Sequence, residues 1–150
     1  MFHARKNQSC TIIVNLVIKR LENMNLDNQQ KLQSLKHFFY KSLRKANQNI
    51  FNDFQSSIVI YKSLINLLCA NITLFQKIPK YDIAKVFLGL GITHINIEDY
   101  PKAKKYLKKA LQFDESSQDI FFYNGIADYN LKKLMKLLKI SLKQFKYPVL

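Results

Sequence analysis

The sequence predicts an all-α protein built from antiparallel helix pairs, and three observations support this prediction. Apolar residues recur at intervals of three and four along five or six segments, which is the spacing of one helix face. The sequence contains no convincing strand pattern. The small residues Gly91, Ala103 and Ala110 lie at matching levels of two neighbouring segments, where they would let two antiparallel helices approach closely. A chain of 150 residues is long enough for one domain with a substantial core.

The first two expected helices are separated by a capping signal. The first spans about residues 9–25, and its apolar positions are Ile13, Leu16, Val17, Leu21 and Met24. Asp27 and Gln30 have the spacing of a capping box, so the second helix should begin there. Its apolar stripe consists of Leu32, Leu35, Phe39, Leu43 and Ala46. We therefore expect two parts: residues 1–26, an N-terminal helix that packs on or caps the rest, and residues 27–150, the helical domain.

A third helix is expected to run without a break from about Phe54 to Lys77, where Pro79 stops it. This segment is apolar almost all round, so the helix should be central in the fold. Its apolar residues are Ile58, Tyr61, Leu64, Ile65, Leu68, Ile72 and Phe75.

The next helix pair is the most clearly patterned part of the chain. One helix should span about residues 81–97, and Asp99 can cap the next. Pro101 is tolerated in the first turn of that helix, because the N–H groups there have no intrahelical bond to lose. The second helix has one clean apolar face, made by Ala103, Tyr106, Leu107, Ala110 and Leu111. Its other face carries Lys102, Lys104, Lys105, Lys108 and Lys109.

Residues 84–117 resemble a tetratricopeptide repeat, a helix pair of about 34 residues. Phe87 stands at the large aromatic position of that family's pattern, Leu90 and Gly91 at its Leu-Gly, and His94 where the family packs a tyrosine ring. A degenerate second repeat would cover residues 118–146, with a turn about three residues shorter than usual. The resemblance implies a short solenoid whose packing positions are Phe87, Leu90, Gly91, Ala103, Leu107, Ala110, Phe121 and Gly125, with Leu134, Leu138 and Ser141 in the last helix.

The resemblance also implies a partner-binding groove along the first helix of each repeat. The groove positions are Leu88, Ile92, Ile95, Phe122, Tyr123 and Ile126. Similar repeats that clamp a terminal carboxylate use Lys and Asn where this chain has Leu88 and Ile92, so an apolar helix or strand is the favoured occupant. The chain's own preceding or N-terminal helices are an alternative occupant.

The charge balance favours an acidic partner. The chain has 24 Lys and Arg against 10 Asp and Glu, a net charge of +14, which is typical of proteins that meet nucleic acid, anionic lipid or an acidic protein segment. Bias from an AT-rich genome is the alternative, since it explains 21 Lys against 3 Arg, although it does not explain the scarcity of acids. The last helix has a basic surface made by Lys132, Lys133, Lys136, Lys139 and Lys143. That surface could face solvent at the end of an array, or face a membrane, an RNA or a calmodulin-like groove.

No catalytic, metal or cofactor motif is present in the sequence. It contains no P-loop, G-x-S-x-G or H-E-x-x-H. His3, His37 and His94 have no ligand spacing with one another or with a cysteine. We therefore expect no enzyme activity, no catalytic residues, no metal and no cofactor.

The expected function is a non-catalytic protein–protein interaction module, an adaptor or structural subunit of a larger assembly. The alternatives are a basic nucleic-acid-binding (ribonucleoprotein) subunit, or a membrane-surface protein that uses its C-terminal helix. No apolar run reaches the length of a transmembrane segment. Cys10 and Cys69 lie far apart and indicate free thiols in a reducing, intracellular compartment, with the cytoplasm or cytoskeleton favoured over organelles.

Overall fold

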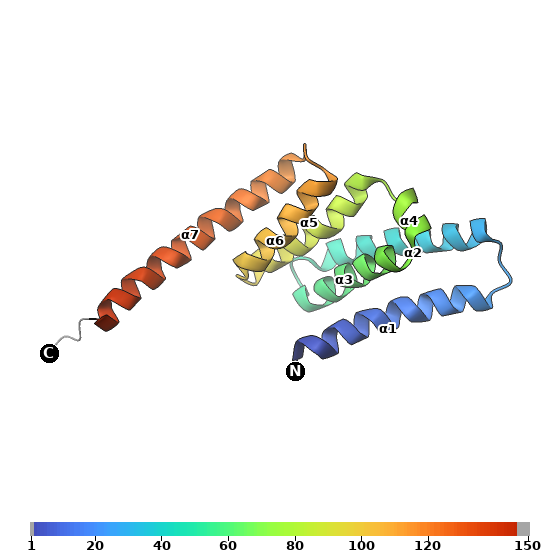
Figure 1. The fold of residues 1–150 in the computed structure, drawn as a ribbon, viewed down its shortest axis with the longest axis horizontal. Coiled ribbons are helices and arrows are strands. Elements are labelled where there is room, and N and C mark those ends of the chain that lie inside the picture. Colours follow the sequence, from blue (N-terminus) through green and yellow to red (C-terminus); the bar gives the residue numbers. More distant parts are fainter. Residues whose placement is uncertain (1, 147–150) are drawn as a thin grey trace.

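The computed structural model describes the backbone of residues 2–146 and the side chains of residues 12–145. Seven helices and no strand occupy that range (Figure 1). They are α1 (Phe2–Asn23), α2 (Asn28–Asn49), α3 (Phe54–Ala70), α4 (Ile72–Lys77), α5 (Lys80–Asn96), α6 (Tyr100–Phe113) and α7 (Gln118–Lys146). The predicted all-α fold is therefore confirmed, with antiparallel packing between neighbouring helices.

The helices pack in an order that puts α3 and α5 at the centre. α3 contacts α1, α2 and α5, while α5 pairs with α6, and α6 pairs with α7. In α3 the side chains of Tyr61, Leu64 and Leu67 are fully buried. The predicted central position of this segment is confirmed for its first 17 residues.

The expected single helix over residues 54–77 is wrong, because Asn71 divides it into α3 and α4. Asn71 has an extended backbone (φ −133°, ψ 93°), and its N–H donates to the Leu67 carbonyl at the end of α3. Its side-chain Oδ1 accepts from the Leu74 N–H at 2.9 Å and so caps α4. One asparagine thus ends one helix and starts the next. Ile72 and Phe75 consequently leave the central core and are exposed.

The contact face of α1 also differs from the prediction. Val14 is buried, and Val17, Ile18 and Leu21 pack partly against the core. These four positions follow the helical intervals of three and four, but the face is turned relative to the predicted one. Of the predicted set, Ile13, Leu16 and Met24 are exposed.

Two of the predicted helix caps are confirmed. At the start of α2 the Gln30 N–H donates to Asp27 Oδ1 at 2.7 Å, and the Asp27 N–H donates to Gln30 Oε1 at 3.1 Å. At the start of α6 the Asp99 side chain accepts from the Lys102 N–H, with Pro101 in the first turn. These two caps fix the residues at which α2 and α6 begin.

The turn between α5 and α6 contains a left-handed residue. Glu98 has φ 61°, and the Asp99 N–H reaches back to the His94 carbonyl at 2.8 Å. This bond spans the last turn of α5 in the pattern of a Schellman motif, which satisfies a carbonyl that the helix leaves free. The turn returns the chain directly along α5, so α6 packs antiparallel to it.

The expected turn within residues 118–146 is wrong, because α7 continues through the whole segment. No proline lies in this range, and Gly125 does not take a positive φ, so nothing in the backbone interrupts the helix. The second helix pair expected from the 34-residue offset is therefore one helix of 29 residues.

Candidate interaction surfaces

The predicted packing positions of the α5–α6 pair lie in its interface. Leu90, Ala103, Leu107 and Ala110 are fully buried. A Cβ added at Gly91 would lie 2.6 Å from Leu107 Cγ, which is too close for a real contact. The absence of a side chain at this position therefore allows the close approach of the two helices. Phe87 is also buried and stacks on Phe113, with ring centroids 5.6 Å apart.

Two predicted packing positions in α7 do not pack. Phe121 is exposed, and a Cβ added at Gly125 would meet nothing within 4 Å. The reason is that α7 buries Ile120 and Ala127 instead, which are seven residues apart and share one face. Lys104 of α6 forms an ion pair with Asp128 of α7 and holds the two helices together on this side.

The six predicted groove residues lie on α5 and the first part of α7, and they differ in accessibility. Ile92 is buried, so little of its surface is available to a partner. Leu88, Ile95, Tyr123 and Ile126 are half-buried. Phe122 is 64% exposed and meets Tyr123 edge to face, with ring centroids 5.3 Å apart. The most accessible residue of this set is therefore Phe122, which lies beside Tyr123 on α7.

His94 is a packed ring, as predicted. It is 4% exposed, and it stacks on Tyr106 with ring centroids 5.3 Å apart. Neither ring nitrogen has a hydrogen-bond partner, and Nδ1 lies 3.8 Å from Asp99 Oδ2. Burial lowers the pKa of His94 to about 4, although the Asp99 charge acts in the opposite direction. The imidazole is thus neutral at pH 7.

The second half of α7 makes a surface that we call the overhang, residues 132–145. Every side chain in the overhang is exposed, and it extends past the other helices (Figure 1). α7 has 29 residues and α6 has 14, a difference of about 22 Å at 1.5 Å per residue. Leu134, Leu138 and Ser141, predicted to pack within a second repeat, instead face solvent, because no helix of the described residues lies beside them.

The predicted basic surface lies on the overhang. Lys132, Lys133, Lys136, Lys139 and Lys143 are all exposed. No acidic residue follows Asp128 in the sequence, and Asp128 itself pairs with Lys104 of α6, so none of these five lysines has an ion pair among the described residues. Two of the five lysines of α6 differ, because Lys104 pairs with Asp128 and Lys102 with Asp99.

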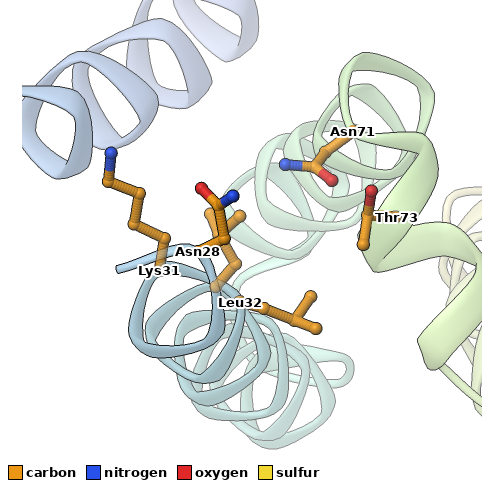
Figure 2. Close-up of a pocket in the computed structure, with 6 residues that line it drawn as sticks. Asn28, Lys31, Leu32, Asn71 and Thr73 are labelled. Carbon is orange, nitrogen blue, oxygen red and sulfur yellow. The ribbon is translucent and has the colours of Figure 1, made fainter. Parts of the chain in front are cut away.

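A cavity of about 410 Å³ lies between the start of α2 and α4, and Figure 2 shows residues that line it. Asn28 and Lys31 come from the first turn of α2, and Asn71 and Thr73 from the start of α4. Asn71 is already engaged as the cap of α4. The lining contains one ammonium group and no carboxylate or thiol, so it lacks the acid–base pair that a catalytic site needs.

A second cavity, of about 520 Å³, lies between α2 and α5 and has Asp82 in its lining. The Asp82 carboxylate is buried and fully engaged: Tyr40 Oη donates to Oδ2 at 2.8 Å, and Lys85 Nζ donates to Oδ1 at 3.0 Å. Burial, followed by the hydrogen bond to Asp82, raises the pKa of Tyr40 to about 12. The Tyr40–Asp82 bond links α2 to α5, whereas Lys85 and Asp82 both belong to α5.

Comparison with protein-family models, with curated proteins and with solved structures finds no match for this chain. Among the described side chains, no group of three or more His, Cys, Asp or Glu is placed to hold a metal ion. In the same part of the chain, no helix combines the length and apolar character needed to cross a membrane. Cys69 is an exposed free thiol, whereas the side chain of Cys10 lies outside the described residues.

Proposed function

We propose that this protein is a non-catalytic interaction module, an adaptor or structural subunit of a larger intracellular assembly. It binds an apolar segment of a partner protein along α5 and the first part of α7. The resemblance of residues 84–117 to a tetratricopeptide repeat supports this proposal, since the first helices of such repeats line the binding face. In this proposal the helix pairs form a short solenoid whose last helix is α7.

The observation that carries the proposal is the aromatic pair on α7. Phe122 is 64% exposed beside the half-buried Tyr123 and close in sequence to the half-buried Ile126. Aromatic side chains are enriched in the centres of protein interfaces, because they bury a large area for little loss of conformational freedom. A partner segment that covers Phe122 would remove its exposed ring from water, together with the exposed parts of the half-buried groove residues on α5 and α7.

Affinity purification followed by mass spectrometry tests this proposal with two matched variants. Phe122→Asp places a charge in the proposed interface. Phe121→Asp makes the same change at an adjacent, equally exposed ring that points about 100° away around the helix. We expect a partner that co-purifies with the wild type and with Phe121→Asp and is lost with Phe122→Asp. An identical set of co-purifying proteins for all three chains, each with an unchanged circular dichroism spectrum, would refute the proposed groove.

A nucleic-acid-binding subunit is the second candidate, favoured by the net charge of +14. Fluorescence titration against a mixed-sequence oligonucleotide at two salt concentrations separates the two candidates. A nucleic-acid-binding protein should lose affinity with a log–log salt slope of about −0.9 per phosphate neutralised on duplex DNA. Absence of binding at low salt removes this candidate.

A further inference from the structure

The overhang of α7 is held firmly at one end and has no contacts of its own. Ile120 and Ala127 are buried against the body, and Asp128 pairs with Lys104 of α6. From residue 132 to residue 145 every side chain is exposed. A solitary helix of this length is only marginally stable in water. The overhang would therefore gain stability from any surface that buries its apolar side.

Most apolar residues of the overhang form one continuous stripe, and Leu137 and Ile140 lie off it. The residues of the stripe recur at intervals of three and four from the last half-buried position, Leu131, to the end of the helix, so they share one side of it. The stripe consists of Leu131, Leu134, Met135, Leu138, Leu142 and Phe145. Leu138 is 55% exposed and Phe145 88% exposed. Residues 131, 135, 138, 142 and 145 keep the four-three spacing of a coiled-coil seam, and Leu134 makes this side wider than that seam.

The lysines occupy the other side of the same helix. At about 100° per residue, Lys132, Lys136, Lys139 and Lys143 lie together, on the side away from Leu138. Lys133 and Ile140 lie between or beside them. This side carries only one sign of charge, as the outer face of α6 does, but none of its lysines forms an ion pair within the part of the chain that the structure describes. The partner of the overhang must therefore accommodate apolar groups and be negatively charged.

A bilayer with anionic headgroups meets both requirements better than the other acidic partners do. Nucleic acid would neutralise the lysines and leave the apolar stripe in water. A single protein helix seated on the stripe would have Lys132 and Lys139 at its edge but would leave Lys136 and Lys143 in water. At a bilayer surface the stripe enters the headgroup–acyl boundary, while the long lysine side chains extend sideways and upward to the phosphates.

We propose that the overhang is a membrane-docking helix that lies in the plane of an anionic phospholipid surface. Leu134, Met135, Leu138 and Leu142 enter the interface, and Lys132, Lys136, Lys139 and Lys143 contact the headgroups. The docked state is interfacial, because residues 131–146 reach only about 24 Å as a helix, and the hydrocarbon core is about 30 Å thick. This activity is separate from the partner groove, since it uses neither Phe122 nor Tyr123.

Vesicle co-sedimentation of the full chain tests the docking. We expect binding to vesicles of phosphatidylcholine and phosphatidylserine, weak binding to phosphatidylcholine alone, and release at high salt. Each lysine near an anionic surface contributes roughly a fivefold factor in binding, so changing Lys132, Lys136, Lys139 and Lys143 to Gln should weaken binding by two orders of magnitude or more. Changing the exposed Lys41, Lys45, Lys105 and Lys108 to Gln removes the same charge and should have a much smaller effect.

The apolar stripe is tested with a second matched pair. Leu138→Glu with Leu142→Glu should abolish sedimentation. Phe51→Glu with Ile72→Glu, at equally exposed apolar positions elsewhere, should leave it unchanged. All four positions are exposed, so neither double variant should alter the thermal unfolding of the body.

Tryptophan fluorescence reports the insertion directly, because the chain has no natural Trp. Leu138→Trp should shift its emission to the blue when anionic vesicles are added, and Ile72→Trp should not shift. The proposal is wrong if the wild type does not sediment with anionic vesicles, if it binds both vesicle types equally, or if the two lysine variants lose binding to the same extent.

Discussion

The helix α5 and the overhang of α7 are both rich in apolar residues, but their surroundings are opposite. Eleven of the 17 residues of α5 are buried, including two glycines and a histidine. In the overhang no side chain is buried. The apolar residues therefore predict a helix in each segment, but they do not show whether the surface that covers the helix belongs to the same chain. The following experiments test this contrast, from the largest expected effect to the smallest.

The same leucine truncation should have very different costs in the two regions. Leu107 is fully buried between α5 and α6, so Leu107→Ala should lower the free energy of unfolding by about 2–5 kcal/mol through lost burial and a cavity. Leu138→Ala, on the overhang, should change it by less than about 0.5 kcal/mol. Urea unfolding followed by circular dichroism measures both. Equal costs would mean that the overhang is packed in solution.

The buried histidine should make the α5–α6 pair sensitive to acid. Burial depresses the pKa of His94 from 6.5 to about 4 in the folded protein. Between pH 6.5 and pH 4, His94 is therefore protonated in the unfolded chain but not in the folded chain. The free energy of unfolding falls as the pH is lowered through this range, until His94 is also protonated in the folded state near pH 4. The full loss amounts to about 3 kcal/mol at 1.36 kcal/mol per pKa unit.

His94→Phe isolates this contribution, because it keeps a ring beside Tyr106 and removes the titration. The difference in unfolding free energy between the wild type and this variant should change between pH 6.5 and pH 4 and stay constant above pH 7. A difference that does not vary with pH would show that His94 is accessible to water.

Replacing glycine by alanine should have opposite effects on stability at Gly89 and at Gly125. An added Cβ at Gly89 would overlap the ring of Tyr61, which is fully buried and whose Oη donates to Asn47 Oδ1 at 2.6 Å. Gly89→Ala should therefore destabilise the protein by about 1–3 kcal/mol through overpacking. Gly125→Ala meets open space and should stabilise it by up to about 1 kcal/mol, the difference in helix propensity. Thermal unfolding would contradict this contrast if both changes had the same sign.

The turn between α5 and α6 should tolerate a stabilising change. Glu98 has φ 61°, a conformation that costs a residue with a Cβ roughly 1–2 kcal/mol. Glu98→Gly relieves that cost but loses conformational entropy on folding, so we expect a net gain of about 0.5 kcal/mol. An unchanged or lowered melting temperature would show that the Glu98 side chain makes a compensating interaction in solution.

Local chemistry could be predicted from the sequence more reliably than packing partners. The caps at Asp27 and Asp99 were predictable because the donor and acceptor lie three residues apart. The break at Asn71 was missed because the apolar pattern continues across it, although an asparagine before a short helix is itself a capping signal.

The errors in the C-terminal part have a different cause. The turn within residues 118–146 rested on a 34-residue offset between Gly91 and Gly125, not on a residue that breaks helices. Gly91 faces Leu107, whereas Gly125 faces open space, so the same residue type has two unrelated roles. The position at which α6 ends determines which side of α7 packs against it. The periodicity of apolar residues alone does not predict that side. The groove residues depend on tertiary packing in the same way, as the burial of Ile92 shows.

The continuity of α7 sets a fixed rotational phase between its two ends. One unbroken helix joins Ala127 to Leu142. The direction that the apolar stripe of the overhang faces is therefore determined by how Ile120 and Ala127 pack against the body. One extra alanine after Asn130 would turn the overhang by about 100° about the helix axis, and seven would nearly restore the original direction. A surface that binds the overhang therefore also orients the rest of the protein. The number of residues between Ala127 and the overhang sets that orientation.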